Sequence, residues 1–357
     1  MDLDIYLDDL ERRIDPDQEL DLEQRWCAFA HGRCPEPLFI PQRSPVAPRI
    51  DWPSVPIDDT LDDLDLNILR ELSHCSRELE HGGGLLLHLR ANYGVGILPT
   101  AFGAEEYRMP REQDTLPNVR ALGPERIPAL LAGGQPPVDA GRLADVWRWA
   151  GRMDELLDGR PLLSRHLHRY HPDLQGPMDV CELLWGSDIF YDLYDEPERV
   201  QALLDLICDT YETVMDRWLA WEPGALPAGY TCHWGLVHGG RIMLRDDSAM
   251  NLSPTMFGDF IAPWDARLLE RYGGAVHFCG RGDHYIEQLA ALPGLRAVNM
   301  SQPQLNDLDR ILDHTVRNRL PLLGLDHHAA PALPADLPVG MVHMHRCPEE
   351  SHVSSRA

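Results

Sequence analysis

The chain has 357 residues, 44% of them hydrophobic, so it is long enough to bury a large core. Its formal net charge of −25 would repel nucleic acid phosphates and anionic lipid headgroups, and no Lys/Arg run offsets it, so neither is an expected partner. No apolar run has transmembrane length and the acidic opening is unlike a signal peptide, which predicts a cytoplasmic protein.

Residues 1–59 are predicted to form an N-terminal extension. Apolar residues recur at helical spacing over residues 1–33, and Pro16 divides the pattern into two short amphipathic helices. Residues 34–59 are rich in proline and predict an irregular connection. We therefore expect a helical cap over residues 1–59 and a main domain over residues 60–357.

Helix and strand patterns alternate along the main domain. The pattern predicts helices at about 61–80, 140–157, 197–221, 254–271, 283–292 and 306–319. A strand segment follows each helix; the first, residues 83–103, is almost wholly apolar and ends in a glycine-rich loop, as strands of parallel sheets do. This βαβ spacing predicts a parallel α/β fold.

A (β/α)8 TIM barrel is the favoured form of that fold. No glycine-rich nucleotide-binding motif follows any strand, which removes the main support for a doubly wound nucleotide-binding sheet. Barrel active sites lie just past the C-terminal ends of the strands. Polar residues occupy such positions throughout the chain: Asn92, Tyr93, Asp173, Gln175, Cys232, His233, His277, Cys279, Ser301, Gln302, Asp326, His327 and His328.

His277 and Cys279 form a His-x-Cys pair at the end of one predicted strand. Residues i and i+2 of a strand point to the same face, so both side chains can reach one point in the barrel mouth. Imidazole nitrogen and thiolate sulfur suit Zn²⁺, and a catalytic zinc site takes three protein ligands and one open position. Cys347, His343 and His345 are the candidates for the third ligand. Structural packing is the alternative role of the pair.

Other polar residues are candidates for catalysis or substrate binding. Asp247 can orient a zinc-bound histidine or hold a substrate hydroxyl, and His233 can exchange a proton with the substrate, with a buried neutral histidine as the alternative. His284, near a predicted helix start, is a third catalytic candidate. The predicted substrate contacts, with loop scaffolding as the alternative role, are Asn92, Tyr93, Asp173, Gln175 and Gln302.

Residues 245–290, in which SPTMFGDFIAPW is followed by HFCG, resemble the uroporphyrinogen decarboxylase superfamily. The likeness is closer to the branch of cobalamin-dependent methyltransferases, such as methylcobamide:coenzyme M methyltransferases, and extends less sharply over about residues 85–325. It implies a (β/α)8 barrel and zinc held by His277, Cys279 and the distant Cys347. The Arg-rich substrate loop of true decarboxylases is missing from this sequence, and MHRCPEE around Cys347 lacks the glycine-rich context usual in the family.

The expected function is zinc-dependent methyl transfer, in which zinc activates a thiol or another small organic substrate. The implied methyl source is a corrinoid (methylcobalamin) on a separate partner protein, because the chain has no DxHxxG-type corrinoid motif. A metal-independent decarboxylase and a non-catalytic small-molecule-binding barrel are the alternatives. The extra N-terminal segment makes a homodimer the expected assembly.

Overall fold

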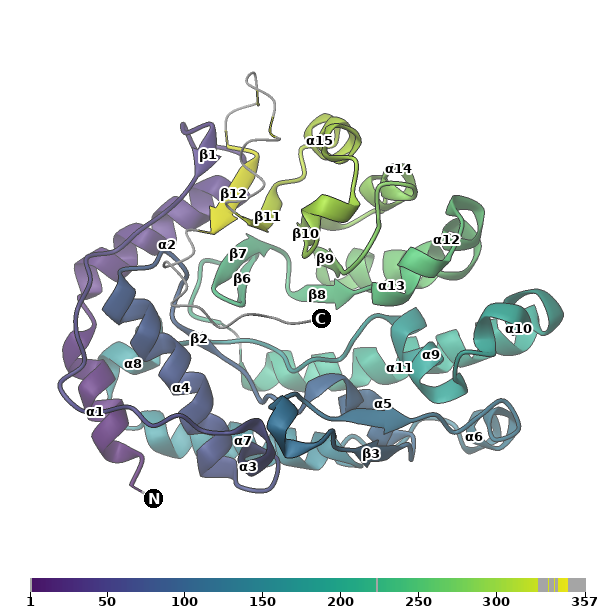
Figure 1. The fold of residues 1–357 in the computed structure, drawn as a ribbon, viewed down its shortest axis with the longest axis horizontal. Helices are drawn as coiled ribbons and strands as arrows, with labels where there is room; N and C mark the ends of the chain where they lie inside the picture. The colour runs from purple at the N-terminus through teal and green to yellow at the C-terminus, as the bar shows by residue number, and fades with distance from the viewer. Residues whose placement is uncertain (1, 223, 327–332, 334–336, 338–339, 346–357) are drawn as a thin grey trace.

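Figure 1 shows the fold in a computed structural model, which describes residues 2–222, 224–326, 333, 337 and 340–345. The main sheet has six parallel strands in the order β1-β12-β11-β10-β9-β8. Their bounds are β1 (Leu38–Phe39), β8 (Ile242–Arg245), β9 (Gly274–Phe278), β10 (Leu295–Met300), β11 (Leu322–Asp326) and β12 (Val342–His345). The predicted parallel α/β architecture is confirmed.

Three two-stranded sheets accompany the main sheet. One is the parallel pair β2 (His88–Leu89) and β5 (His168–Arg169). The others are antiparallel: β3 (Glu105–Tyr107) with β4 (Asn118–Arg120), and β6 (Tyr230–His233) with β7 (Leu236–Gly239). Strand pairing among the described residues leaves these sheets separate. The arrangement is consistent with a barrel-like fold, and closure of the ring stays a prediction.

Helices lie outside the arc of main-sheet strands and fill the remaining half of the molecule (Figure 1). In the first half of the chain they are α1 (Asp4–Arg13), α2 (Pro16–Ala30), α3 (Ile57–Thr60), α4 (Leu64–His81), α5 (Ile97–Ala101), α6 (Ile127–Gly133), α7 (Arg142–Leu157) and α8 (Pro161–His166). In the second half they are α9 (Pro177–Trp185), α10 (Ile189–Asp195), α11 (Pro197–Trp221), α12 (Pro254–Phe260), α13 (Ala262–Tyr272), α14 (Ile286–Ala290) and α15 (Leu308–Arg317). Among the described residues, no helix combines the length and apolarity needed to cross a membrane.

Helix α4 illustrates how the sequence specifies these elements. The Asp63 carboxylate accepts a hydrogen bond from Leu66 N at the first turn, and Gly82, at φ 66°, ends the helix in a left-handed conformation. The predicted helix 254–271 is instead broken at Ile261 into α12 and α13. Pro263 lies in the first turn of α13, where its missing N–H leaves no hydrogen bond unmade; inside one continuous helix it would break the ladder.

Two predicted strand segments differ from the structure. The apolar run 83–103 contributes only β2 to a sheet, because its second half turns into the 3-10 helix η1 (Gly94–Gly96) and α5. The segment around Cys232 is a hairpin instead of a parallel strand. Its two turn residues, Trp234 and Gly235, have φ of 51° and 76°, the signature of a tight turn that reverses the chain. The parallel strand that follows α11 is β8.

The predicted N-terminal extension contributes to the main sheet. Helices α1 and α2 meet at Pro16 as expected, with Asp15 capping α2. Within the proline-rich connection, however, Leu38 and Phe39 pair with Val342 and His343 as the edge strand β1. The first 59 residues therefore include one strand of the main sheet.

Side chains alternate between the two faces of the main sheet. On the outer face, Leu244, Val276, Val298 and Leu322 belong to the same buried cluster as the surrounding helices. On the inner face, a second buried cluster joins the hairpin β6–β7 to Met243, Ala275, Ala297 and Leu323. The next inward residues are polar: Arg245, His277 and Asn299 lie side by side in register. This polar layer positions the candidate site.

Candidate metal centre

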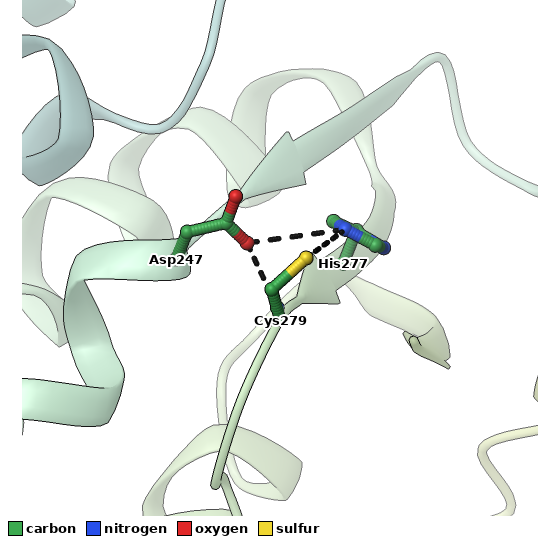
Figure 2. Close-up of side chains that lie close together, drawn as sticks. All are labelled: Asp247, His277 and Cys279. Atoms are coloured by element: carbon green, nitrogen blue, oxygen red, sulfur yellow. Dashed lines mark hydrogen bonds and ion pairs between the residues drawn. The ribbon is translucent and has the colours of Figure 1, made fainter. Parts of the chain in front are cut away.

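Asp247, His277 and Cys279 meet at the C-terminal ends of β8 and β9 (Figure 2). Their possible ligand atoms all lie within 4.8 Å of one another. Cys279 Sγ is 3.4 Å from His277 Nε2, and Asp247 Oδ1 is 3.9 Å from the same nitrogen. Asp247 opens the 3-10 helix η3 (Asp247–Asn251) shortly after β8, and Cys279 follows the last residue of β9, so two adjacent parallel strands position all three residues.

The protonation of the His277 ring is set by its neighbour on β10. Asn299 Nδ2 donates to the Leu323 carbonyl oxygen at 2.7 Å, which orients the amide so that Oδ1 faces His277. Because an amide oxygen can only accept, His277 Nδ1 must be the donor in their 2.5 Å hydrogen bond. The neutral ring then has an unprotonated Nε2, directed at Cys279 and Asp247. Metal-ligating histidines are commonly held by such a bond through the other ring nitrogen.

The position of Asp247 is fixed from both sides. Its backbone N–H and that of Ser248 each donate to the buried Asp179 carboxylate of α9 at 2.8 Å. Its own Oδ1 accepts from Cys279 N at 2.8 Å. The Asp247 side chain is 46% exposed and that of His277 is 11% exposed, so the site reaches the molecular surface on the Asp247 side.

Cys279 is half-buried, and its sulfur lies 3.6 Å from Ser301 Oγ. Burial, with the nearby Asp247 carboxylate, raises the pKa of this thiol to about 11. A cation between the three side chains would offset that charge penalty. One imidazole nitrogen, one thiolate sulfur and one carboxylate oxygen form a donor set that suits zinc and leaves a fourth position open. The residues therefore fit a zinc ion.

The site borders a cavity of about 1120 Å³ on the inner face of the main sheet. His277, Asn299 and Ser301 line it beside Trp234 of the hairpin turn. Two further stretches, residues 41–45 and 82–85, complete much of the lining. Cavities of several hundred Å³ accommodate small organic ligands, so the volume is sufficient for a substrate.

Of the candidates for the third ligand, only the side chain of His343 lies among the described residues, so Cys347 and His345 stay predictions. Cys347, His327, His328 and the side chain of His345 lie outside the described residues. His343 is buried: its Nδ1 accepts from Gly324 N at 3.0 Å, and its ring packs 4.6 Å from that of Trp26. Asp247, anticipated as a residue that orients the ligands or substrate, supplies the third possible ligand atom of this cluster.

His233 and His284 have other surroundings. His233 is fully buried in the hairpin, where its Nδ1 is 2.8 Å from His238 Nε2. Burial, then the nearby His171 and His238, lower its pKa well below the ordinary range, which matches the buried neutral histidine considered as the alternative. His284 Nε2 donates to the Leu252 carbonyl at 2.9 Å and so joins two loops.

The anticipated substrate contacts are held by protein partners. Asp173 accepts from Gln175 and pairs with two buried arginines, Arg90 at 3.2 Å and Arg245 at 3.1 Å. The other three also have protein partners: Asn92 donates to Glu71, the Tyr93 ring faces Arg142, and Gln302 accepts from Gly280 N.

Sequence reasoning missed Asn299 and Arg245. Both are single polar residues at inward positions of strands whose other residues are mostly apolar. A polar residue at an inward position of a mostly apolar strand was the available signal, since buried polar groups need partners. Arg245 lies directly across the strand pair from His277 and stacks 4.7 Å from the Trp234 ring centroid.

No protein-family model matches the chain, and no curated protein matches its sequence. Among solved structures, the fold is similar to that of a methyltransferase from Methanosarcina mazei, with a TM-score of 0.60 and 14% sequence identity. The match covers 90% of this chain and 92% of that chain. Over nine-tenths of its length, the chain therefore shares the fold of a methyltransferase.

Proposed function

We propose that this protein is a methyltransferase-like enzyme in which zinc held by Asp247, His277 and Cys279 activates a thiol or another small organic substrate. The observation that carries the proposal is the convergence of nitrogen, sulfur and oxygen ligand atoms at the strand ends, beside a substrate-sized cavity. The shared fold with a methyltransferase supports it. Membership of the uroporphyrinogen decarboxylase superfamily and a closed barrel belong to the same proposal.

When bound, zinc would lower the pKa of a thiol and keep its sulfur nucleophilic at neutral pH. The protein groups do the positioning. Asn299 keeps Nε2 of His277 unprotonated, and Asp179 fixes the backbone that carries Asp247. Ser301, close to the Cys279 sulfur and lining the cavity, limits where a substrate can approach.

The proposed transfer is a displacement at the methyl carbon. The substrate thiol releases its proton to solvent, and its sulfur donates an electron pair to form the new sulfur–carbon bond. The bond between the methyl group and its donor breaks, and that electron pair stays on the donor. The proposed donor is a methylcorrinoid on a separate protein, as the sequence resemblance implies.

The first test is metal content, measured by plasma mass spectrometry on protein purified without a His tag. Wild type is expected to carry about one zinc ion per chain, and Asp247→Ala, His277→Ala and Cys279→Ala to lose it. His314→Ala and Cys27→Ala remove the same residue types elsewhere and should retain zinc. A wild type that holds no zinc after reconstitution overturns the proposal.

A second test addresses the reaction. Zinc-loaded protein is mixed with methylcobalamin and a thiol, and mass spectrometry follows the methyl thioether. Product from wild type, and none from Cys279→Ala, is expected. If the protein binds zinc but methylates no thiol, the proposed metal site stands and the proposed methyl transfer to thiols is contradicted.

A further inference from the structure

The charged side chains of the cavity indicate which substrates it can hold. Among the described residues of its lining, Arg43 is the one Lys or Arg, whereas Glu78 and Asp326 are acidic. Whether Arg43 can pair with an anionic substrate depends on whether any of its N–H groups is available.

Every N–H group of Arg43 is already used. A guanidinium has five N–H donors. Nε and Nη2 donate to the two oxygens of Glu19 at 2.8 and 2.9 Å, and Nη2 also donates to the Leu85 carbonyl at 2.7 Å. Nη1 donates to the Gly83 carbonyl at 3.0 Å and to Glu78 at 3.3 Å. The Arg43 side chain is 0% exposed, so an anionic group would have to displace a buried partner.

The charge balance of the Arg43 cluster is negative. Glu19, Glu78 and Arg43 together carry one net negative charge. Zinc would not reverse this, because the thiolate of Cys279 and the carboxylate of Asp247 offset its two positive charges. The chain's net charge of −25 adds a repulsive background for anions.

Glu78 is the acidic side chain of this group that reaches the cavity. It is 21% exposed, whereas Glu19 is 2% exposed. Its Oε1 accepts from Leu85 N at 2.8 Å as well as from Arg43. A glutamine would keep that acceptor oxygen while removing the charge, which makes Glu78→Gln a conservative test.

We infer that the cavity takes a neutral or cationic substrate and discriminates against thiols with a sulfonate or carboxylate group. The inference rests on the proposed function, because it assumes that the substrate binds beside the metal.

The test uses Co²⁺ in place of zinc, since its visible spectrum changes when a thiolate joins the site. Three two-carbon thiols that differ mainly in end-group charge are titrated at pH 8: cysteamine (cationic), 2-mercaptoethanol (neutral) and 2-mercaptoethanesulfonate (anionic). Cysteamine is expected to bind at least as tightly as 2-mercaptoethanol, and the sulfonate about three- to tenfold more weakly. Sulfonate binding as tight as that of 2-mercaptoethanol overturns the inference and leaves the proposed function intact.

Variants separate the cavity charge from the acidity of each thiol. Thiol acidity belongs to the ligand, so it cancels when the same three compounds are compared between proteins. Glu78→Gln should reduce the cysteamine-to-sulfonate ratio about threefold, and Glu270→Gln, at an exposed position on α13, should leave it unchanged. An unchanged ratio in Glu78→Gln contradicts the inference. A third outcome is that cobalt binds to His277 and Cys279 but no thiol changes its spectrum. That result overturns thiol activation and the inference together.

Discussion

Asn299 on β10 accepts a 2.5 Å hydrogen bond from Nδ1 of His277 on β9, and the two residues are register partners in the main sheet. The amide also donates to the Leu323 carbonyl on β11. The ring of one proposed zinc ligand is thus connected through Asn299 to the next two strands.

Replacing Asn299 with leucine should weaken zinc binding about 10- to 100-fold, because the His277 ring loses the acceptor that fixes its tautomer and orientation. Competition with a chromophoric chelator measures the affinity. Asn299→Asp keeps an acceptor for Nδ1 and should recover most of that affinity. Asn318→Leu, at the exposed position that follows α15, should have no effect. If wild type and Asn299→Leu bind zinc with equal affinity, Asn299 does not contribute to the metal site.

Asp179→Asn should weaken zinc binding without unfolding the protein. Both carboxylate oxygens of Asp179 accept backbone N–H groups, and an amide NH₂ would face one of these donors. The cost is about 1–3 kcal/mol, divided between the stability of the loop and the position of Asp247. Chelator competition and urea unfolding measure the two parts. A loss of stability with unchanged zinc affinity would show that the position of Asp247 does not depend on Asp179.

Arg43→Met should destabilise the fold by about 3–5 kcal/mol in urea unfolding, because the Glu19 carboxylate would remain buried without its charge partner. The double variant Glu19→Gln with Arg43→Met removes the stranded charge and should regain part of the loss. If the double variant is no more stable than Arg43→Met, the cost comes from lost packing and backbone contacts.

Acid should destabilise the protein through buried neutral histidines. Burial lowers the pKa of His238 from 6.5 to about 4, so the unfolded chain binds more protons between these values. The stability is complete above pH 6.5 and falls as the pH drops towards 4; His238 contributes about 2 kcal/mol of this loss between pH 7.5 and pH 5. In urea unfolding at both pH values, His238→Gln should reduce the pH dependence by that amount, and His81→Gln, at an exposed site, should not. If the stability of wild type and of His238→Gln changes equally between the two pH values, His238 is not the source of the pH dependence.

The sequence was informative where a residue's neighbours along the chain determine its place. His277 and Cys279 are two residues apart, so their shared direction follows from strand geometry alone. Asp247 is 32 residues from Cys279 and joins it only because β8 and β9 are adjacent and parallel, a pairing that the local pattern does not specify. For the same reason Asn299 was missed, since its importance comes from register with His277.

The errors also have local physical causes. Trp234 and Gly235 reverse the chain, but a bulky Trp at positive φ is an uncommon turn residue, so the local sequence predicts a continuous strand instead of a hairpin. The two residues of β1 are too few to show any periodicity, and their place at the sheet edge depends on β12, far along the chain.

The strand order of the main sheet also has a consequence for the order of folding. Strands β8, β9 and β10 follow one another closely in the chain and carry the proposed zinc ligands with Asn299, so little chain entropy is lost when they pair. The edge pair differs, because Leu38 and Val342 lie near opposite ends of the chain and their contact closes a very long loop. The candidate metal centre therefore belongs to the segment that can assemble early, before the two ends of the chain come together.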